Sequence, residues 1–276
     1  MKTFIVPTDF SETSKNAARY AAQVASRVPD VKIILYNVFD KIETGTDGSV
    51  MFNDHEGRRK IMELALESVK SDMLSISPGI DITCIAEEES SFTDSLEKIA
   101  RQHNVDMIIM GITGATSVAQ ILMGSSTLSM VNRNVCPVMI VPPDAVFTGI
   151  KKVVITSDFK EVEKTIPAVR VQALLSIFNP FVHVVNVDSE HYVEITEEYK
   201  TERAKLDAML SNFDRDYSFI RLFDFTDAIN QFVSDYHIDM IITIPKHHSF
   251  LGGLFKSSHT KRLAYHSHVP LIAIHE

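Results

Sequence analysis

The sequence predicts an α/β protein made of two tandem domains, each built on a parallel sheet. Two observations carry this prediction. Short runs rich in β-branched residues alternate with helix-length amphipathic segments along the chain, and the pattern of the first half returns in the second. Strands that alternate with helices imply right-handed βαβ units and therefore parallel strands. The length of 276 residues suits two domains of about 100–150 residues each.

The repeat is visible in short matching segments. Asp9 follows the run Phe-Ile-Val-Pro-Thr, and Asp158 follows Val-Val-Ile-Thr-Ser 149 residues later. Near the fourth expected strand, Val-Asp-Met-Ile-Ile returns as Ile-Asp-Met-Ile-Ile after only 133 residues. The first copy therefore holds an extra segment of 16 residues. We place it around Glu43–Gly57, where glycine, asparagine and aspartate predict a surface loop.

Each copy is expected to contain five strands. In the first copy the helices between them show apolar residues three to four positions apart, and Ser11 is a suitable N-cap for the first helix. The first-copy strands are expected at Thr3–Val6, Lys32–Val38, Asp81–Ala86, Asp106–Met110 and Val138–Val141, and the helices at Ser11–Val28, Arg58–Leu74, Thr93–His103 and Ser126–Asn132. The second-copy strands are expected at Lys152–Ile155, Val182–Val187, Tyr217–Arg221, Asp239–Thr243 and Leu271–Ile274.

The domain boundary is expected in the linker Pro142–Gly149, which gives domains of residues 1–146 and 147–276. The net charge of −9 disfavours binding to nucleic acid or to an anionic membrane. No apolar run approaches the ~20 residues of a membrane span, and the opening residues are too short for a signal-peptide core, so we expect a cytoplasmic protein. Cys84 and Cys136 are expected to be reduced packing residues.

A glycine-rich loop follows the fourth strand of the first copy. Three glycines in the pattern Gly-x2-Gly-x9-Gly precede three hydroxyl residues, in the order Gly111, Gly114, Gly124, Ser125, Ser126 and Thr127. Glycine lets backbone approach a ligand closely, and a helix N-terminus attracts anions. The loop also lies at the carboxyl end of a parallel strand, where open α/β sheets bind ligands. It predicts a phosphate site, although tight turns and an ordinary N-cap use the same residue types.

This loop, together with Asp9 at the end of the first strand, resembles the ATP-binding branch of the universal stress protein family. The resemblance extends over both copies. For each copy it implies a Rossmann-like, adenine nucleotide alpha hydrolase-like domain, which is a five-stranded parallel sheet with helices on both faces. It also implies a stress-response role and a nucleotide lying across the strand ends. ATP, with or without Mg²⁺, is the expected ligand, and ADP and AMP are alternatives.

The resemblance also implies the contacts of that nucleotide. Pro7, Thr8 and Asp9 would line the adenine and ribose side, and Val38 would pack against the base. Met110 and Gly111 would approach the ribose and phosphates, while the phosphates would be held by Gly114, Gly124, Ser125, Ser126 and Thr127. Asp9 has a plainer alternative, because an acid after a strand often caps the following helix.

The second copy departs from this pattern. Gly111, Gly114 and Gly124 correspond to Ile244, His247 and Ser257, so a nucleotide held in the same way is not expected there. The loop is instead basic, and it is either a solvated surface or an anion site. Its basic residues are Lys246, His247, His248, Lys256, His259, Lys261 and Arg262. Two further histidines, His266 and His268, have no cysteine or paired carboxylate at ligand spacing, and we predict no metal site.

The sequence lacks the familiar signatures of catalysis. It has no Gly-x4-Gly-Lys-Ser/Thr, Gly-x-Ser-x-Gly or His-Glu-x-x-His, and no lysine in the glycine loop of the first copy. We therefore expect a regulatory protein in which the nucleotide changes conformation or partner binding, with no catalytic residues. Two alternatives stay open. One is a slow ATPase or autophosphorylating enzyme, and the other is a scaffold or small-ligand carrier that uses the second domain.

The fifth strands predict how the two domains pair. Val138–Val141 and Leu271–Ile274 are apolar and would be exposed sheet edges in isolated domains. The resemblance implies antiparallel pairing of these strands, and fusion of the copies makes that pairing intramolecular. We expect a pseudo-twofold two-domain monomer, with a further homodimer left open.

Overall fold

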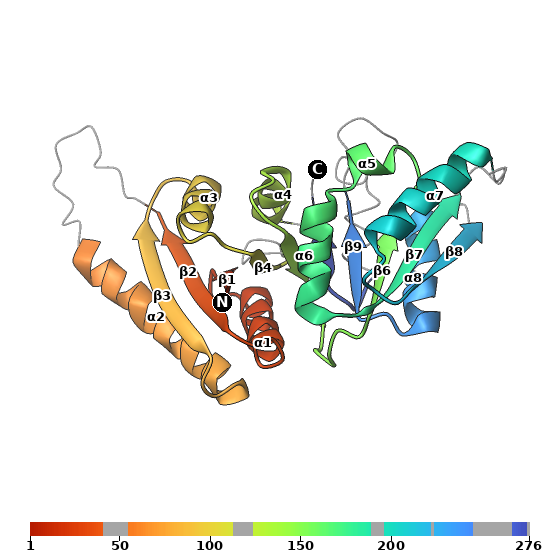
Figure 1. Ribbon diagram of the computed structural model, residues 1–276. Coiled ribbons are helices and arrows are strands. Elements are labelled where there is room, and N and C mark those ends of the chain that lie inside the picture. The colour runs from red at the N-terminus through yellow and green to blue at the C-terminus, as the bar shows by residue number, and fades with distance from the viewer. Residues whose placement is uncertain (41–54, 113–123, 189–195, 222–223, 245–266, 275–276) are drawn as a thin grey trace.

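One sheet of ten strands runs through the whole molecule (Figure 1). The computed structural model describes residues 1–40, 55–112, 124–188, 196–221, 224–244 and 267–274. The strand order is β3-β2-β1-β4-β5-β10-β9-β6-β7-β8. Each half of the sheet therefore repeats the same order about the centre, and the chain consists of two tandem α/β domains.

The first domain confirms every predicted strand and helix to within a few residues. Its elements are β1 (Lys2–Pro7), α1 (Glu12–Ala25), β2 (Val31–Phe39), α2 (His55–Ile76), β3 (Asp81–Glu88), α3 (Phe92–Gln102), β4 (Met107–Gly111), α4 (Ser125–Asn132) and β5 (Val138–Val141). The strands pair in parallel throughout. Ser11 is the N-cap of α1, and its side chain accepts from the Ser14 amide, as predicted.

The predicted surface excursion ends earlier than expected. Because α2 begins at His55, the expectation that a loop continues to Gly57 is wrong. Two contacts fix this first turn: His55 Nδ1 lies 2.8 Å from the Glu88 carboxylate, and Arg58 donates to the Asp40 carbonyl over 2.7 Å. The rest of the predicted excursion, residues 43–54, lies outside the described residues.

The second domain repeats the strand pattern but divides its first helix. Its elements are β6 (Lys152–Thr156), α5 (Val162–Thr165), α6 (Ala168–Phe178), β7 (Phe181–Asp188), α7 (Glu197–Met209), β8 (Arg215–Arg221), α8 (Phe225–Tyr236), β9 (Met240–Thr243) and β10 (Leu271–Ala273). All five strands are those predicted, and they pair in parallel with one another.

The two domains join through their fifth strands. Strand β10 pairs with β5 in antiparallel register, with Leu271 opposite Ile140 and Ala273 opposite Val138. Both strands are buried. The predicted intramolecular pairing is therefore confirmed, and the two exposed edges that separate domains would carry are removed.

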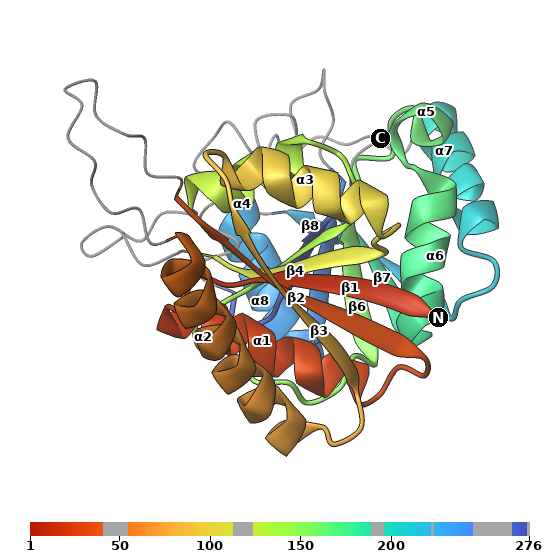
Figure 2. The same cartoon turned by 90° about the vertical axis from the view of Figure 1, so that its left-hand side faces the viewer.

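Helices cover both faces of the sheet (Figure 2). Alternate residues of β1 belong to different apolar clusters: Phe4 and Val6 belong to a cluster that includes residues of α1, α2, α6 and α7, whereas Ile5 belongs to one that includes residues of α3, α4 and α8. We call these the α1 face and the α3 face. All three side chains are fully buried, which explains why β1 reads as a continuous apolar run.

No helix in the described part of the chain is long and apolar enough to cross a bilayer. Cys84 and Cys136 are free thiols, as predicted, although each is half-buried and not fully enclosed. Burial raises the pKa of Cys84 to about 11 and that of Cys136 to about 12, so both thiols are protonated at neutral pH.

Candidate functional site

The residues predicted to bind a nucleotide meet at the carboxyl ends of β1, β2 and β4. Strand β1 lies between the other two, and the strand order reverses direction between β1 and β4. Pro7 ends β1, Gly111 ends β4 and Val38 is the penultimate residue of β2. Such a reversal point is where open α/β sheets form their ligand crevice. Gly114 lies outside the described residues.

The turn after β1 is held by Thr8. The Thr8 amide donates to the Tyr36 carbonyl over 2.8 Å, and the Thr8 hydroxyl accepts from the Phe10 amide at 3.0 Å. Asn37 Nδ2 donates to the Thr8 carbonyl over 2.8 Å. Phe10 has a φ of 63°, so the chain reverses sharply here. Thr8 itself is buried, and its side chain is used to build the turn.

Asp9 has the local contacts of a capping acid. Its Oδ1 accepts from the Ser11 amide at 3.1 Å and from the Ser11 hydroxyl at 2.5 Å, and Ser11 in turn caps α1. The second domain contains the same turn: Asp158 accepts from the Lys160 amide at 3.1 Å. The capping alternative for Asp9 therefore has direct structural support. The Asp9 side chain is nevertheless exposed at the strand ends.

Gly111 is required by the packing of α1 on β4. A Cβ atom built on Gly111 would lie 2.8 Å from the Thr13 carbonyl oxygen, closer than real Cβ contacts allow. The first turn of α1 therefore rests directly on the backbone at the end of β4. This requirement holds with or without a ligand, and the sequence pattern alone did not reveal it.

The second domain shows what replaces this contact. Ile244 occupies the position of Gly111, is buried and packs in the same cluster as Val162, the counterpart of Thr13. The helix that follows β6 is broken: α5 has four residues, and α6 begins only after Pro167. Glu202 of α7 accepts from the Val162 amide over 2.6 Å, so a side chain of α7 satisfies the first backbone amide of α5.

The N-terminus of α4 lies beside Gly111. Gly124 is the N-cap, its amide donates to the Ile112 carbonyl over 2.7 Å, and no described side chain caps the helix. The amides of the first helical turn have no acceptor within a helix, which makes such an end an anion site. Ser125 is exposed and Ser126 half-buried, whereas Thr127 is buried and its hydroxyl donates to the Gly111 carbonyl over 3.1 Å.

A salt-bridge network anchors the other end of α4. Arg133, the C-cap of α4, lies 2.6 Å from Asp94 Oδ1 and 2.6 Å from Glu97 Oε2, both on α3. Its guanidinium holds the pKa of Glu97 below the ordinary value, together with Arg101. This network is not predictable from sequence, because the partners are more than 30 residues apart and no local motif marks them.

No group of three or more histidine, cysteine or acidic side chains is placed to hold a metal ion within the described ranges. His268 contacts Asp144 in the linker, while His266 and the predicted basic loop of the second domain lie outside those ranges.

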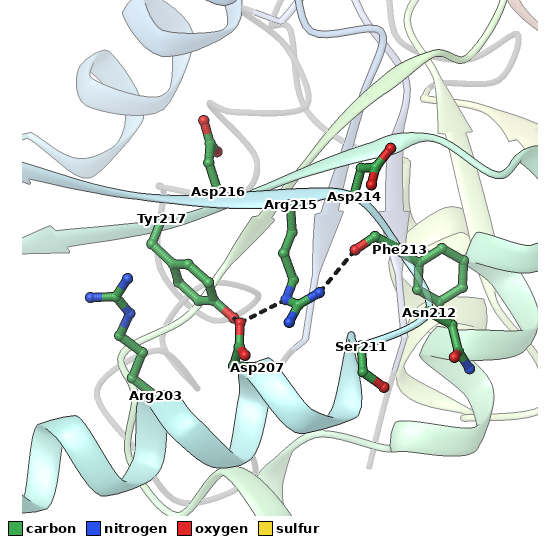
Figure 3. Close-up of a pocket in the computed structure, with 9 residues that line it drawn as sticks. All are labelled: Arg203, Asp207, Ser211, Asn212, Phe213, Asp214, Arg215, Asp216 and Tyr217. Carbon is green, nitrogen blue, oxygen red and sulfur yellow. Dashed lines mark hydrogen bonds and ion pairs between the residues drawn. The ribbon is translucent and has the colours of Figure 1, made fainter.

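A surface pocket of ≈ 620 Å³ lies elsewhere, at the amino end of β8 (Figure 3). Several of its polar groups contact one another: Arg215 Nε donates to Asp207 Oδ1 over 2.7 Å, Tyr217 donates to the same oxygen over 3.0 Å, and the Arg203 guanidinium stacks on the Tyr217 ring. Burial and Asp207 raise the pKa of Tyr217 to about 12. The pocket is remote from the carboxyl strand ends, and we assign it no ligand.

Comparison with known proteins gives both a family match and whole-chain structural matches. A model of the universal stress protein family matches residues 1–142. A universal stress protein of Methanocaldococcus jannaschii is 29% identical over 159 residues, which cover 51% of this chain and 94% of the relative. A universal stress protein of Synechocystis is 29% identical over 142 residues, which cover 51% of this chain and 85% of the relative.

Two solved structures match over the full length. A universal stress protein from Archaeoglobus fulgidus aligns with a TM-score of 0.71 and 16% identity, covering 99% of this chain and 96% of its own. A functionally unknown protein from Pseudomonas aeruginosa aligns with a TM-score of 0.62 and 11% identity, covering 100% of this chain and 92% of its own. The tandem fold is therefore shared by proteins whose sequences have diverged widely.

Proposed function

The chain belongs to the universal stress protein family, and on that basis we propose that its first domain binds an adenine nucleotide, foremost ATP, as a regulatory ligand. The observation that carries this proposal is the uncapped N-terminus of α4 at the point where the strand order reverses. An uncapped helix end in that crevice presents amide donors and a positive dipole to phosphate groups.

The packing of the described residues supports a more specific division of roles than the sequence did. Ser125 and Ser126 offer hydroxyl donors, and Thr127 offers its amide, because the Thr127 hydroxyl proton is already donated to Gly111. Gly111, Gly114 and Gly124 would let the phosphate chain lie close to the backbone.

The base and ribose would occupy the other side of the crevice. Val38 would pack on the base, Pro7 and the Thr8 backbone would border it, and Met110 would approach the ribose. Asp9 would reach a ribose hydroxyl with the exposed part of its carboxylate. ADP and AMP fit the same contacts with fewer phosphates.

The lack of positive side chains in the glycine loop favours a regulatory role for the nucleotide over rapid phosphoryl transfer. The sequence from Gly111 to Thr127 contains no lysine or arginine. Rapid phosphoryl transfer needs positive charge at the γ-phosphate, which Mg²⁺ carried by the nucleotide would supply only in part. Helix α4 leads through Cys136 into β5, which pairs with β10 of the second domain. A nucleotide held at α4 would therefore act on the element that precedes the domain junction.

The test is a calorimetric titration of the full chain with Mg-ATP, comparing wild type with Ser125→Asp. An acid in the first turn of a helix is compatible with folding, because it complements the helix dipole, but it repels a phosphate. We expect at least about tenfold weaker ATP binding in this variant. Ser258→Asp, at the corresponding position of the second domain, is the matched control and should leave the affinity unchanged. Equal affinities for wild type and Ser125→Asp would refute the proposed site.

A further inference from the structure

A buried polar pair stands at the edge of the proposed base site. Tyr36 of β2 is fully buried on the α3 face, and its hydroxyl donates to Glu87 Oε2 of β3 over 2.6 Å. Burial and the Glu87 carboxylate both raise the pKa of the Tyr36 phenol above its ordinary value. The phenol is therefore the donor and Glu87 the acceptor.

Strand register puts Glu87 next to the residue expected to pack on the base. Glu87 lies directly opposite Val38 in the β2–β3 pairing. Val38 is two residues beyond Tyr36, and side chains two apart on a strand share a face. Val38, Phe92 and Met110 all pack on the apolar cluster of the α3 face. The Glu87 carboxylate thus borders the surface on which a base would lie.

One carboxylate oxygen of Glu87 is available to a ligand. Oε2 is held by Tyr36, whereas Oε1 accepts from no residue in the described part of the chain. The Glu87 side chain is half-buried, so part of it is accessible to solvent. A carboxylate held by one internal donor and open on its other oxygen has the geometry of a recognition group.

The second domain indicates that the fold does not need this pair. The corresponding residues are Val185 and Ile220, and Ile220 lies opposite Val187 just as Glu87 lies opposite Val38. Both pack on the α3 face. Burying polar groups costs free energy that the apolar alternative avoids. The pair is therefore present in the domain with the glycine loop and replaced by apolar residues in the domain without it.

We propose that Glu87, positioned by Tyr36, accepts a hydrogen bond from the exocyclic amino group of a 6-aminopurine and so selects adenine nucleotides, an inference that rests on the proposed nucleotide site. A purine with a carbonyl oxygen at that position would bring two acceptors together. It would also leave Glu87 Oε1 without the amino donor of the ligand, and such a lost hydrogen bond is the basis of strong discrimination in hydrogen-bonding sites.

The experiment compares ATP with ITP, which has a carbonyl oxygen in place of the 6-amino group and a proton on N1, by calorimetric titration of the full chain. Wild type should bind ATP at least about tenfold more tightly than ITP. Glu87→Gln should bring the two affinities to within about twofold, because a glutamine amide both donates and accepts. Tyr36→Phe should give an intermediate ratio, since the carboxylate remains but loses its positioning donor.

Two further variants serve as controls for the effect of Glu87 on the preference for ATP over ITP. Glu88→Gln changes the neighbouring acid, which faces His55 and Arg58 on α2, and it should keep the wild-type ratio. The double variant Tyr36→Val, Glu87→Ile carries the residues of the second domain, so it should fold and lose the preference. A wild-type ratio in Glu87→Gln, or equal binding of ATP and ITP by wild type, overturns this inference alone. Binding of neither nucleotide by folded wild type overturns the proposed function and this inference with it.

Discussion

The two domains agree at the end of their first strand and differ at the end of their fourth. In both, an asparagine of the second strand donates over 2.8 Å to the carbonyl before the acid, from Asn37 to Thr8 and from Asn186 to Ser157. Both turns continue into a phenylalanine with positive φ. Features common to both domains are thus explained by the fold. Gly111 occurs in the first domain alone but is required there by packing, whereas the Tyr36–Glu87 pair has no such packing requirement and is the stronger candidate for function.

The largest expected effect comes from moving the second-domain residue into the first. Gly111→Ile forces side-chain atoms into the Thr13 backbone, so α1 must separate from β4. We expect a loss of stability of about 3 kcal/mol, typical of severe overpacking, together with loss of ATP binding. Urea denaturation and ATP titration measure the two effects.

A second glycine provides the control for that variant. Gly124 has a φ of −56°, which any residue adopts, so Gly124→Ala should cost no more than the loss of a favourable N-cap residue and lower the urea midpoint far less than Gly111→Ile. If Gly111→Ile unfolds at the same urea concentration as Gly124→Ala, the contact between α1 and β4 does not explain the glycine.

A medium effect is expected from the shared turn. Asn37→Ala and Asn186→Ala each remove one buried hydrogen bond to the turn carbonyl, and each should cost about 1 kcal/mol in urea denaturation. Similar costs in the two domains are expected because the bonds are equivalent. A large cost at Asn37 with none at Asn186 would show that the turns differ in strength despite their matching geometry.

The smallest effect concerns the salt bridges of α4. The folded-state pKa of Glu97 lies below its ordinary value of 4.5, so the ionised carboxylate stabilises the folded protein. That contribution is present above about pH 4.5 and is lost as the pH falls through the lowered pKa. In the second domain Asn230 replaces Glu97 and does not titrate.

Arg133→Met should therefore weaken the acid dependence of thermal stability below pH 4.5, while neutral-pH stability falls only slightly because the pair is partly exposed. Thermal melts from pH 3 to pH 7 measure this difference. An unchanged pH profile in Arg133→Met would remove Glu97 from the groups that favour the folded state at neutral pH.

Local pattern predicted most of the fold. The bounds of α1, α3 and α4 and of all ten strands follow from apolar periodicity and from the repeat, and the apolar fifth strands pair as expected. The start of α2 is not predictable from local sequence, because Gly57 is typical of a loop, whereas contacts with Glu88 and Asp40 stabilise the helix there. The break between α5 and α6 coincides with Pro167, a residue that disrupts a helix interior, so a local signal does mark it.

The candidate site was predictable only in outline. The glycine loop and its strand context came from sequence, and Gly111, Gly124 and the hydroxyl residues do meet at one strand edge. Two details of the site depend on contacts between distant segments. The Thr127 hydroxyl is already donated to the Gly111 carbonyl, and Gly111 is required because a side chain there would meet the Thr13 backbone. The bond from Tyr36 to Glu87 spans 51 residues and depends on strand register, which residue spacing does not encode.

The antiparallel junction of β5 and β10 lets the two domains acquire substitutions independently of each other. A symmetric homodimer repeats every substitution on both sides of its axis, so its two sites must change together. Here the two sides of the junction are separate stretches of one chain, and a change from glycine to isoleucine at the end of the fourth strand can enter one side alone. Because the partners cannot dissociate on dilution, every molecule carries one glycine-ended and one isoleucine-ended domain at any protein concentration.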